Sequence, residues 1–133
     1  MDRIKDYVKI VLEKADAELE FAKLGLESNY YNGAISKAYY AAFNAVRAIV
    51  IKDNLTFSTH KSVIAHFNRY YVHGGFFPKD YTQKISTLFD ARQHSDYDLE
   101  KQPTKEEAEE SIIAAAEIIQ AIKDYLKKDY ELT

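Results

Sequence analysis

Arg92 and Asp96 are the residues whose types and spacing are best suited to chemistry. They extend the series Tyr81, Ile85 and Leu88 by two further steps of four residues, so an α-helix would place all five on one face. An arginine directed toward a protein interior must be paired, and Asp96 lies one helical turn away. Two interpretations are open: an ion pair that fixes the end of the helix, or a cleft in which Arg92 binds a phosphate or another polar ligand.

A second polar stripe precedes this region in the chain. Ser36, Tyr40, Asn44 and Arg47 follow one another at helical spacing beside a seam of alanines. Such a stripe needs water or polar partners, and we expect it to line the same cleft as Arg92. The alternative is an ordinary solvated face with Arg47 paired to a surface carboxylate.

The histidines show no spacing that would hold a metal ion. His60, His66, His73 and His94 form neither a His-x3-His nor a His-Glu-x-x-His pattern, and the glycine-rich phosphate loops are also missing from the sequence. We therefore expect no metal and no cofactor. Thr59, His60 and Lys61 do gather donors at the expected start of a helix, where anions tend to bind.

Composition restricts the class of protein. The 133 residues are 47% hydrophobic and carry a net charge of -3, which provides one core and no overall attraction to nucleic acid or anionic membranes. Cysteine is absent, which excludes thiolate chemistry and suits a reducing cytoplasm. No apolar run approaches the ~20 residues that span a bilayer. We expect a cytoplasmic protein with no membrane contact, forming one domain over residues 1–133.

Periodicity predicts the elements that position these residues. Apolar groups recur with helical spacing, and no segment alternates as a strand would. The alanine seam of the second helix allows close helix packing, Pro78 is expected in the first turn of the fourth helix, and Thr104 with Glu107 forms a capping box before the fifth. The expected fold is an all-α antiparallel bundle of about five helices. The predicted helices cover residues 4–26, 31–51, 58–71, 78–97 and 104–128.

The order of several short motifs resembles one known family. The segments are Ala38-Tyr39-Tyr40-Ala41-Ala42-Phe43 running into Arg47-Ala48, Thr59-His60-Lys61, and Arg92 followed by Asp96-Tyr97. Together they resemble the HEPN domain over nearly the whole chain, in the subgroup with an Arg-x3-Asp-Tyr ending. The resemblance implies a HEPN-like bundle, similar to nucleotidyltransferase substrate-binding subunits, that forms a homodimer.

The resemblance also implies a function. Such proteins are commonly paired with an MNT-type nucleotidyltransferase in toxin–antitoxin modules, and they bind nucleotide or RNA at the dimer cleft. The implied ligand-binding residues are Arg92, Asp96, Tyr97, Tyr40, Asn44, Arg47, His60 and Lys61. Many relatives are metal-independent endoribonucleases whose hallmark is an arginine followed, after four to six residues, by a histidine that can serve as general acid or base. Tyr97 is the candidate acceptor if the partner transfers AMP to this chain.

The sequence departs from the nuclease hallmark. After Arg92 the next histidine is His94, which an α-helix turns by roughly 200°, and Asp96-Tyr97 occupies the region of the hallmark histidine. The favoured hypothesis is therefore a binding or weakly catalytic HEPN partner of a nucleotidyltransferase. The alternatives are an endoribonuclease toxin that uses Arg92 with His94, His60 or Asp96, and a stand-alone nucleotide-binding module.

Overall fold

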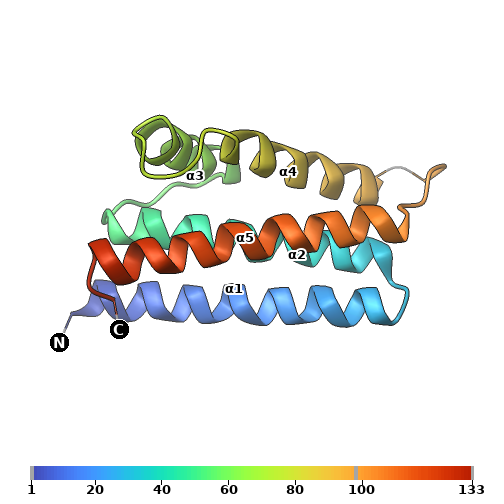
Figure 1. Ribbon diagram of the computed structural model, residues 1–133, viewed down its shortest axis with the longest axis horizontal. Helices are drawn as coiled ribbons and strands as arrows, with labels where there is room; N and C mark the ends of the chain where they lie inside the picture. Colours follow the sequence, from blue (N-terminus) through green and yellow to red (C-terminus); the bar gives the residue numbers. More distant parts are fainter. Residues whose placement is uncertain (1, 98, 133) are drawn as a thin grey trace.

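The computed structural model describes residues 2–97 and 99–132, and within them every regular element is helical. Two long helices, α1 and α2, form an antiparallel pair, and α5 returns alongside them (Figure 1). The short helix α3, the π-helical segment η1 and helix α4 lie on the side of α2 that faces away from α1. The elements are α1 (Arg3–Glu27), α2 (Tyr31–Lys52), α3 (His60–Phe67), η1 (Asn68–Val72), α4 (Tyr81–Tyr97) and α5 (Lys105–Asp129).

Helix α2 is the centre of the bundle because it packs against α1, α3, α4 and α5. Its alanine seam is fully buried, which confirms the predicted close approach of neighbouring helices. A small residue at each of these positions lets the α2 backbone come near both long neighbours. The seam consists of Ala34, Ala38, Ala41, Ala45 and Ala48.

Helix caps confirm two predicted starts. The Thr104 hydroxyl accepts a hydrogen bond from the Glu107 amide at 3.1 Å, and the Thr59 hydroxyl accepts one from the Ser62 amide at 3.1 Å. Helix α4 starts later than expected, at Tyr81, and Pro78 lies in the turn before it, where its carbonyl accepts from the Tyr81 amide. The expectation that Pro78 stands in the first turn was wrong.

The third helix was predicted as α-helical to Tyr71, but its last part is a π-helix. The His73 amide donates to the carbonyl of Asn68, five residues earlier, at 2.8 Å. Gly74 follows directly, and a Cβ there would collide with the Tyr70 carbonyl. The chain therefore makes a wide turn and then a tight one before α4. Among the described residues no helix is long and apolar enough to cross a membrane.

Candidate functional site

Arg92 continues the inner face of α4, as its spacing predicted. Tyr81, Ile85 and Leu88 are buried on that face, and the Arg92 side chain beyond them is 18% exposed. Its Nε donates to Oδ2 of Asp96 at 3.2 Å. The predicted ion pair is present, and Arg92 lies half-buried at the edge of the core.

Two tyrosines of α2 contact the Arg92 guanidinium through their rings. Its central carbon lies 5.4 Å from the ring centre of Tyr39 and 5.1 Å from that of Tyr40, both within the range of cation–π attraction. Tyr39 is fully buried and packs edge-on against Phe89 of α4. These contacts fix the position of Arg92 because its aromatic supports belong to the central helix.

His60, the first residue of α3, joins this cluster. Its Nδ1 lies 3.0 Å from the Tyr39 hydroxyl, and its ring stacks on Phe43 at 3.9 Å between ring centres. The Thr59 cap fixes the start of α3 one residue earlier, so the imidazole is held over the aromatic face of α2. We name Arg92, Asp96, Tyr39, Tyr40 and His60 the arginine cluster.

Burial and charge set the proton positions in the arginine cluster. Burial, and then the nearby charge of Arg92, lower the pKa of His60, so the imidazole is neutral at pH 7. Burial raises the pKa of Tyr39 to about 12 against the opposing effect of Arg92, so its hydroxyl stays protonated. If Tyr39 donates to Nδ1, His60 presents an Nε2–H donor. If Nδ1–H donates to Tyr39, Nε2 is free to act as a base.

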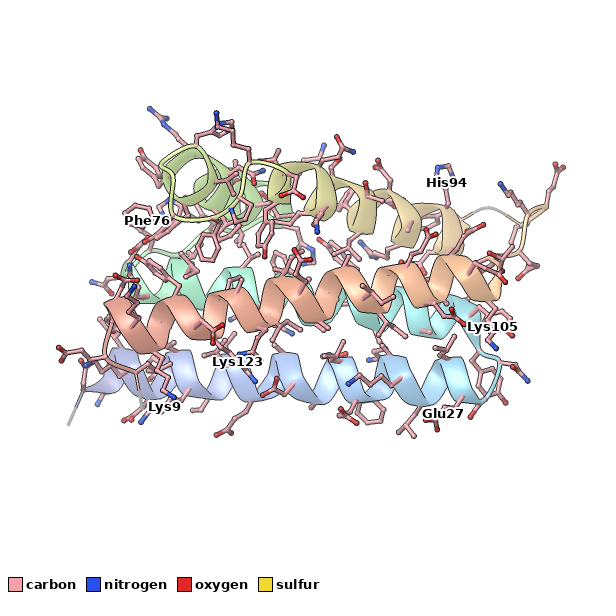
Figure 2. The ribbon with its side chains drawn as sticks, in the orientation of Figure 1. Lys9, Glu27, Phe76, His94, Lys105 and Lys123 are labelled. Atoms are coloured by element: carbon pink, nitrogen blue, oxygen red, sulfur yellow. The ribbon has the colours of Figure 1, made fainter. Side chains whose placement is uncertain are left out.

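The other residues at the end of α4 lie outside the arginine cluster. His94 is exposed and lines a separate pocket with Lys101 and Glu107, and Figure 2 shows it on the outer side of α4. The turn predicted between Arg92 and His94 thus separates them in space. Tyr97 is 71% exposed at the last turn of α4.

The polar stripe on α2 does not form one surface. Tyr40 contacts Arg92, whereas Asn44 is buried in the core and Arg47 is exposed in a different pocket with Tyr7 and Lys14 of α1. The expectation that Arg47 lines the cleft of Arg92 was therefore wrong, because Arg47 lies about two helical turns along α2 from Tyr40 and opens into a pocket formed with α1.

Lys61 lies on a different surface from its neighbour His60. It is exposed and lines a groove between α3 and α4 that also contains Phe89, the residue that packs on Tyr39. Lys61 therefore lies beside the arginine cluster, on a surface continuous with it through Phe89.

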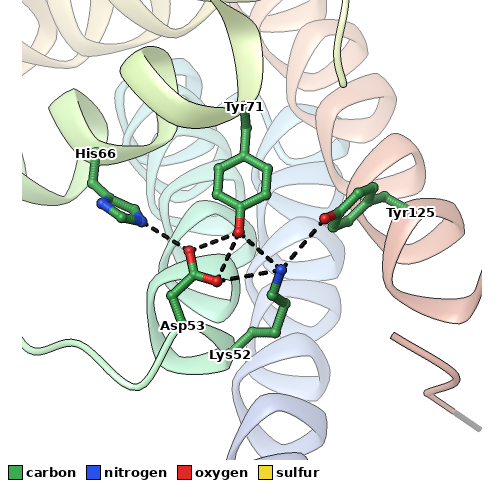
Figure 3. A network of polar contacts seen from close by, with 5 residues as sticks. All are labelled: Lys52, Asp53, His66, Tyr71 and Tyr125. Atoms are coloured by element: carbon green, nitrogen blue, oxygen red, sulfur yellow. Dashed lines mark hydrogen bonds and ion pairs between the residues drawn. The ribbon is translucent and has the colours of Figure 1, made fainter. Parts of the chain in front are cut away.

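A second polar network was not anticipated (Figure 3). The Tyr71 hydroxyl accepts from Lys52 Nζ at 2.8 Å and donates to the Asp53 carboxylate, with 2.7 and 2.6 Å to its two oxygens. His66 Nε2 donates to Asp53 Oδ2 at 2.9 Å, and Lys52 also donates to the Tyr125 hydroxyl at 3.3 Å. The network ties the end of α2 to α3, η1 and α5.

The contacts within this network set the protonation states of Lys52, Asp53 and Tyr71. Burial alone would raise the pKa of Asp53, but hydrogen bonds from His66 and Tyr71 and the charge of Lys52 outweigh it and lower that pKa. Burial would likewise lower the pKa of Lys52, and the hydrogen bonds to Tyr71 and Tyr125 raise it instead. Burial, together with the bond to Asp53, raises the pKa of Tyr71 to about 12. Lys52 and Asp53 therefore stay ionised while Tyr71 stays neutral.

The fold and the site together define a five-helix bundle protein with a half-buried arginine beside a histidine. Among the described residues, no three or more side chains of the metal-ligating types gather into a group. The HEPN domain model matches residues 8–125. A Methanocaldococcus jannaschii protein named "putative toxin" is 34% identical over 125 residues, which cover 94% of this chain and 92% of that protein. The chain therefore belongs to the HEPN domain family.

Solved structures agree on the fold. A HEPN domain protein from Thermotoga maritima is similar with a TM-score of 0.67 at 20% identity, over 89% of this chain and 98% of that one. An archaeal HEPN homologue is similar with a TM-score of 0.68 at 24% identity, over 96% and 100% of the two chains. At these identities the likeness supports the five-helix arrangement alone.

Proposed function

We propose that this chain is the HEPN component of a toxin–antitoxin type module and that its arginine cluster binds nucleotide or RNA phosphate at a homodimer cleft. An MNT-type nucleotidyltransferase is the proposed partner, and the cytoplasm is the proposed location. The observation that carries this proposal is the half-buried Arg92 guanidinium, held on Tyr39 and Tyr40. A fixed guanidinium suits a phosphate, since its parallel N–H groups can bond two oxygens at once.

The surroundings of Arg92 also suit a nucleic acid. The partly exposed rings of Tyr40 and His60 provide stacking surfaces for unpaired bases, and Lys61 adds a positive charge in the adjoining groove. The relative named "putative toxin" agrees with a toxin-type role. Because the overall charge is -3, attraction to RNA has to come from this local cluster rather than from the whole surface.

The binding test compares two arginines on the same protein. Arg92→Gln is expected to weaken binding of a fluorescent single-stranded RNA, measured by anisotropy, by about tenfold or more, as loss of a charge-assisted bond implies. Arg47→Gln is the matched control, because Arg47 is exposed in a separate pocket. Equal affinity of Arg92→Gln and wild type would refute binding at the arginine cluster. Sedimentation of wild type tests the homodimer.

The arrangement of His60 favours an endoribonuclease as the second candidate. His60 and Arg92 meet at Tyr39 and would supply a general acid or base and a cation for the phosphate, whereas His94 faces away. In this case His60→Gln abolishes RNA cleavage in the presence of a chelator and His94→Gln does not. Failure of wild type to cut RNA at high enzyme concentration removes this candidate.

A stand-alone nucleotide-binding module is the third reading of the same cluster. A nucleotide at 100 times its dissociation constant should stabilise the protein by about 2.7 kcal/mol. Thermal shift measures this directly, and Arg92→Gln should reduce the shift. No shift with any nucleotide at millimolar concentration would eliminate this reading.

Tyr97 is proposed as the acceptor if the partner transfers AMP. Its exposed hydroxyl oxygen would attack the α-phosphate of ATP, with pyrophosphate leaving and the hydroxyl proton passing to solvent or a base of the partner. Incubation with the nucleotidyltransferase and ATP should add the mass of one AMP to wild type and none to Tyr97→Phe. Unchanged wild-type mass would reject the modification, while modification of Tyr97→Phe would assign it to another residue.

A further inference from the structure

A shallow pocket lies on the outer side of α3 and η1, away from the arginine cluster. It has a volume of about 520 Å³, within the usual range for small-ligand sites. The segment that follows α2 forms one wall and the helical side chains form the other. Its polar and aromatic lining residues are Phe57, Ser62, His66, Arg69 and Tyr70.

His66 connects this pocket to the network of Figure 3. A carboxylate only accepts hydrogen bonds, so the contact to Asp53 places a proton on His66 Nε2. The other ring nitrogen, Nδ1, has no hydrogen-bond partner among residues 2–97 and 99–132. The ring thus has one nitrogen anchored in the network and the other left for a ligand of the pocket.

Ser62 and Arg69 supply two donors to the same pocket. The Ser62 oxygen accepts from the Thr59 hydroxyl at 2.8 Å, so its own proton is free to be donated. The Arg69 guanidinium lies over the Tyr70 ring at 5.3 Å and makes no ion pair within the described part of the chain. Ser62, His66 and Arg69 follow at steps of four and three, and all three line the pocket.

The two aromatic walls of the pocket are partly open to water. Phe57 is 38% exposed and Tyr70 is 52% exposed, and their ring centres lie 5.7 and 5.0 Å from that of His66. Core packing does not explain rings left open to water, whereas a planar ligand could stack on them. The donors Ser62 and Arg69 and the rings of Phe57 and Tyr70 therefore suit a ligand that combines an anionic group with an aromatic ring.

We propose that this pocket binds a phosphate monoester that carries an aromatic ring. Arg69 and Ser62 would each donate to a phosphate oxygen, His66 Nδ1 would accept from the phosphate hydroxyl, and the aromatic ring of the ligand would lie against Phe57 and Tyr70. Two donors and one acceptor suit a phosphate monoester better than a carboxylate, because its three free oxygens can accept hydrogen bonds and one of them can also carry a proton. This site is independent of the proposed function at Arg92.

The test uses phenyl phosphate as the probe, titrated into the full chain and followed by calorimetry and by the NMR signals of the His66 ring. We expect one site per chain and shifts at His66. Arg69→Gln should weaken binding at least tenfold, and Tyr70→Leu should also weaken it. Arg47→Gln, the matched exposed arginine, should leave the affinity unchanged. His66→Gln keeps an N–H donor for Asp53 but removes Nδ1, so it should also weaken binding.

Several results would overturn the proposal. These are an unshifted His66 signal at millimolar phenyl phosphate, equal affinity of wild type and Arg69→Gln, or equal effects of Arg69→Gln and Arg47→Gln. Arg92→Gln should bind phenyl phosphate as wild type does, so loss of RNA binding at Arg92 and loss of this site are separate observations. Titration with AMP and with phosphotyrosine amide distinguishes a nucleotide from a modified tyrosine as the source of the ligand.

Discussion

Tyr71→Phe tests how much one hydroxyl contributes to the stability of the network that ties α2 to α3, η1 and α5. The substitution keeps the ring but removes the bonds at 2.8 Å to Lys52 and at 2.6 and 2.7 Å to the Asp53 carboxylate. Hydrogen bonds to charged groups contribute about 1.5–3 kcal/mol. Asp53 keeps His66, and Lys52 keeps Tyr125 and the ion pair at 3.3 Å to Asp53, so we expect a net loss of about 2 kcal/mol.

The expected thermal shift follows from chain length. An unfolding entropy of about 2.1 cal/mol/K per residue gives about 0.28 kcal/mol/K for 133 residues, so a loss of about 2 kcal/mol lowers Tm by about 7 °C. Calorimetry and urea unfolding measure both quantities. The matched control is Tyr70→Phe, whose exposed neighbouring hydroxyl should matter by less than about 0.5 kcal/mol.

A double-mutant cycle with Asp53→Asn checks that the loss comes from the network. The two substitutions should couple by about 0.5 kcal/mol or more, because their side chains are in direct contact. If Tyr71→Phe is as stable as Tyr70→Phe, or if the cycle shows additive losses, the network does not stabilise the fold as argued.

Three further predictions concern stability. The pKa of Asp53 is lowered in the folded protein, so the stabilisation that ionised Asp53 provides is complete above pH ~4 and is lost as pH falls through its folded-state pKa. Urea unfolding at decreasing pH should therefore show the difference in unfolding free energy between wild type and Asp53→Asn approaching zero. A difference that stays constant with pH would contradict this. Ala41→Leu overpacks the fully buried seam of α2 and should cost about 1–3 kcal/mol in urea unfolding, whereas no loss would mean a looser interface. Thr104→Ala should cost about 1 kcal/mol through loss of the α5 cap, and Thr104→Ser, which keeps the hydroxyl, should recover most of it.

Much of the fold could be predicted from the sequence because long helices repeat their apolar positions. Helices α1, α2 and α5 begin and end within about two residues of their predicted limits, and the Thr104 cap is where its spacing placed it. The π-helical segment could not be predicted. Its hydrogen bonds span five residues instead of four, and no side-chain periodicity marks that change.

The candidate site was only partly visible for a similar reason. Arg92 and Asp96 lie one turn apart, so their ion pair follows from spacing. His60 meets Tyr39 across 21 positions, and Lys52 meets Tyr125 across 73, so neither contact has a local signature. The doublet Lys52-Asp53 directly follows the predicted end of the second helix at residue 51, and both residues proved to be the centre of a network.

The π-helix of η1 has a consequence for how this chain can change during evolution. A π-helical turn contains one residue more than the α-helical turn it replaces. Deleting a single residue between Asn68 and Val72 would restore α-helical bonding and rotate all that follows by about 100°. Tyr71 would then turn away from Asp53, and Phe77 would leave the core. Relatives that share the network should therefore differ in η1 by substitution while keeping its length, and insertions should accumulate in the loop before α5.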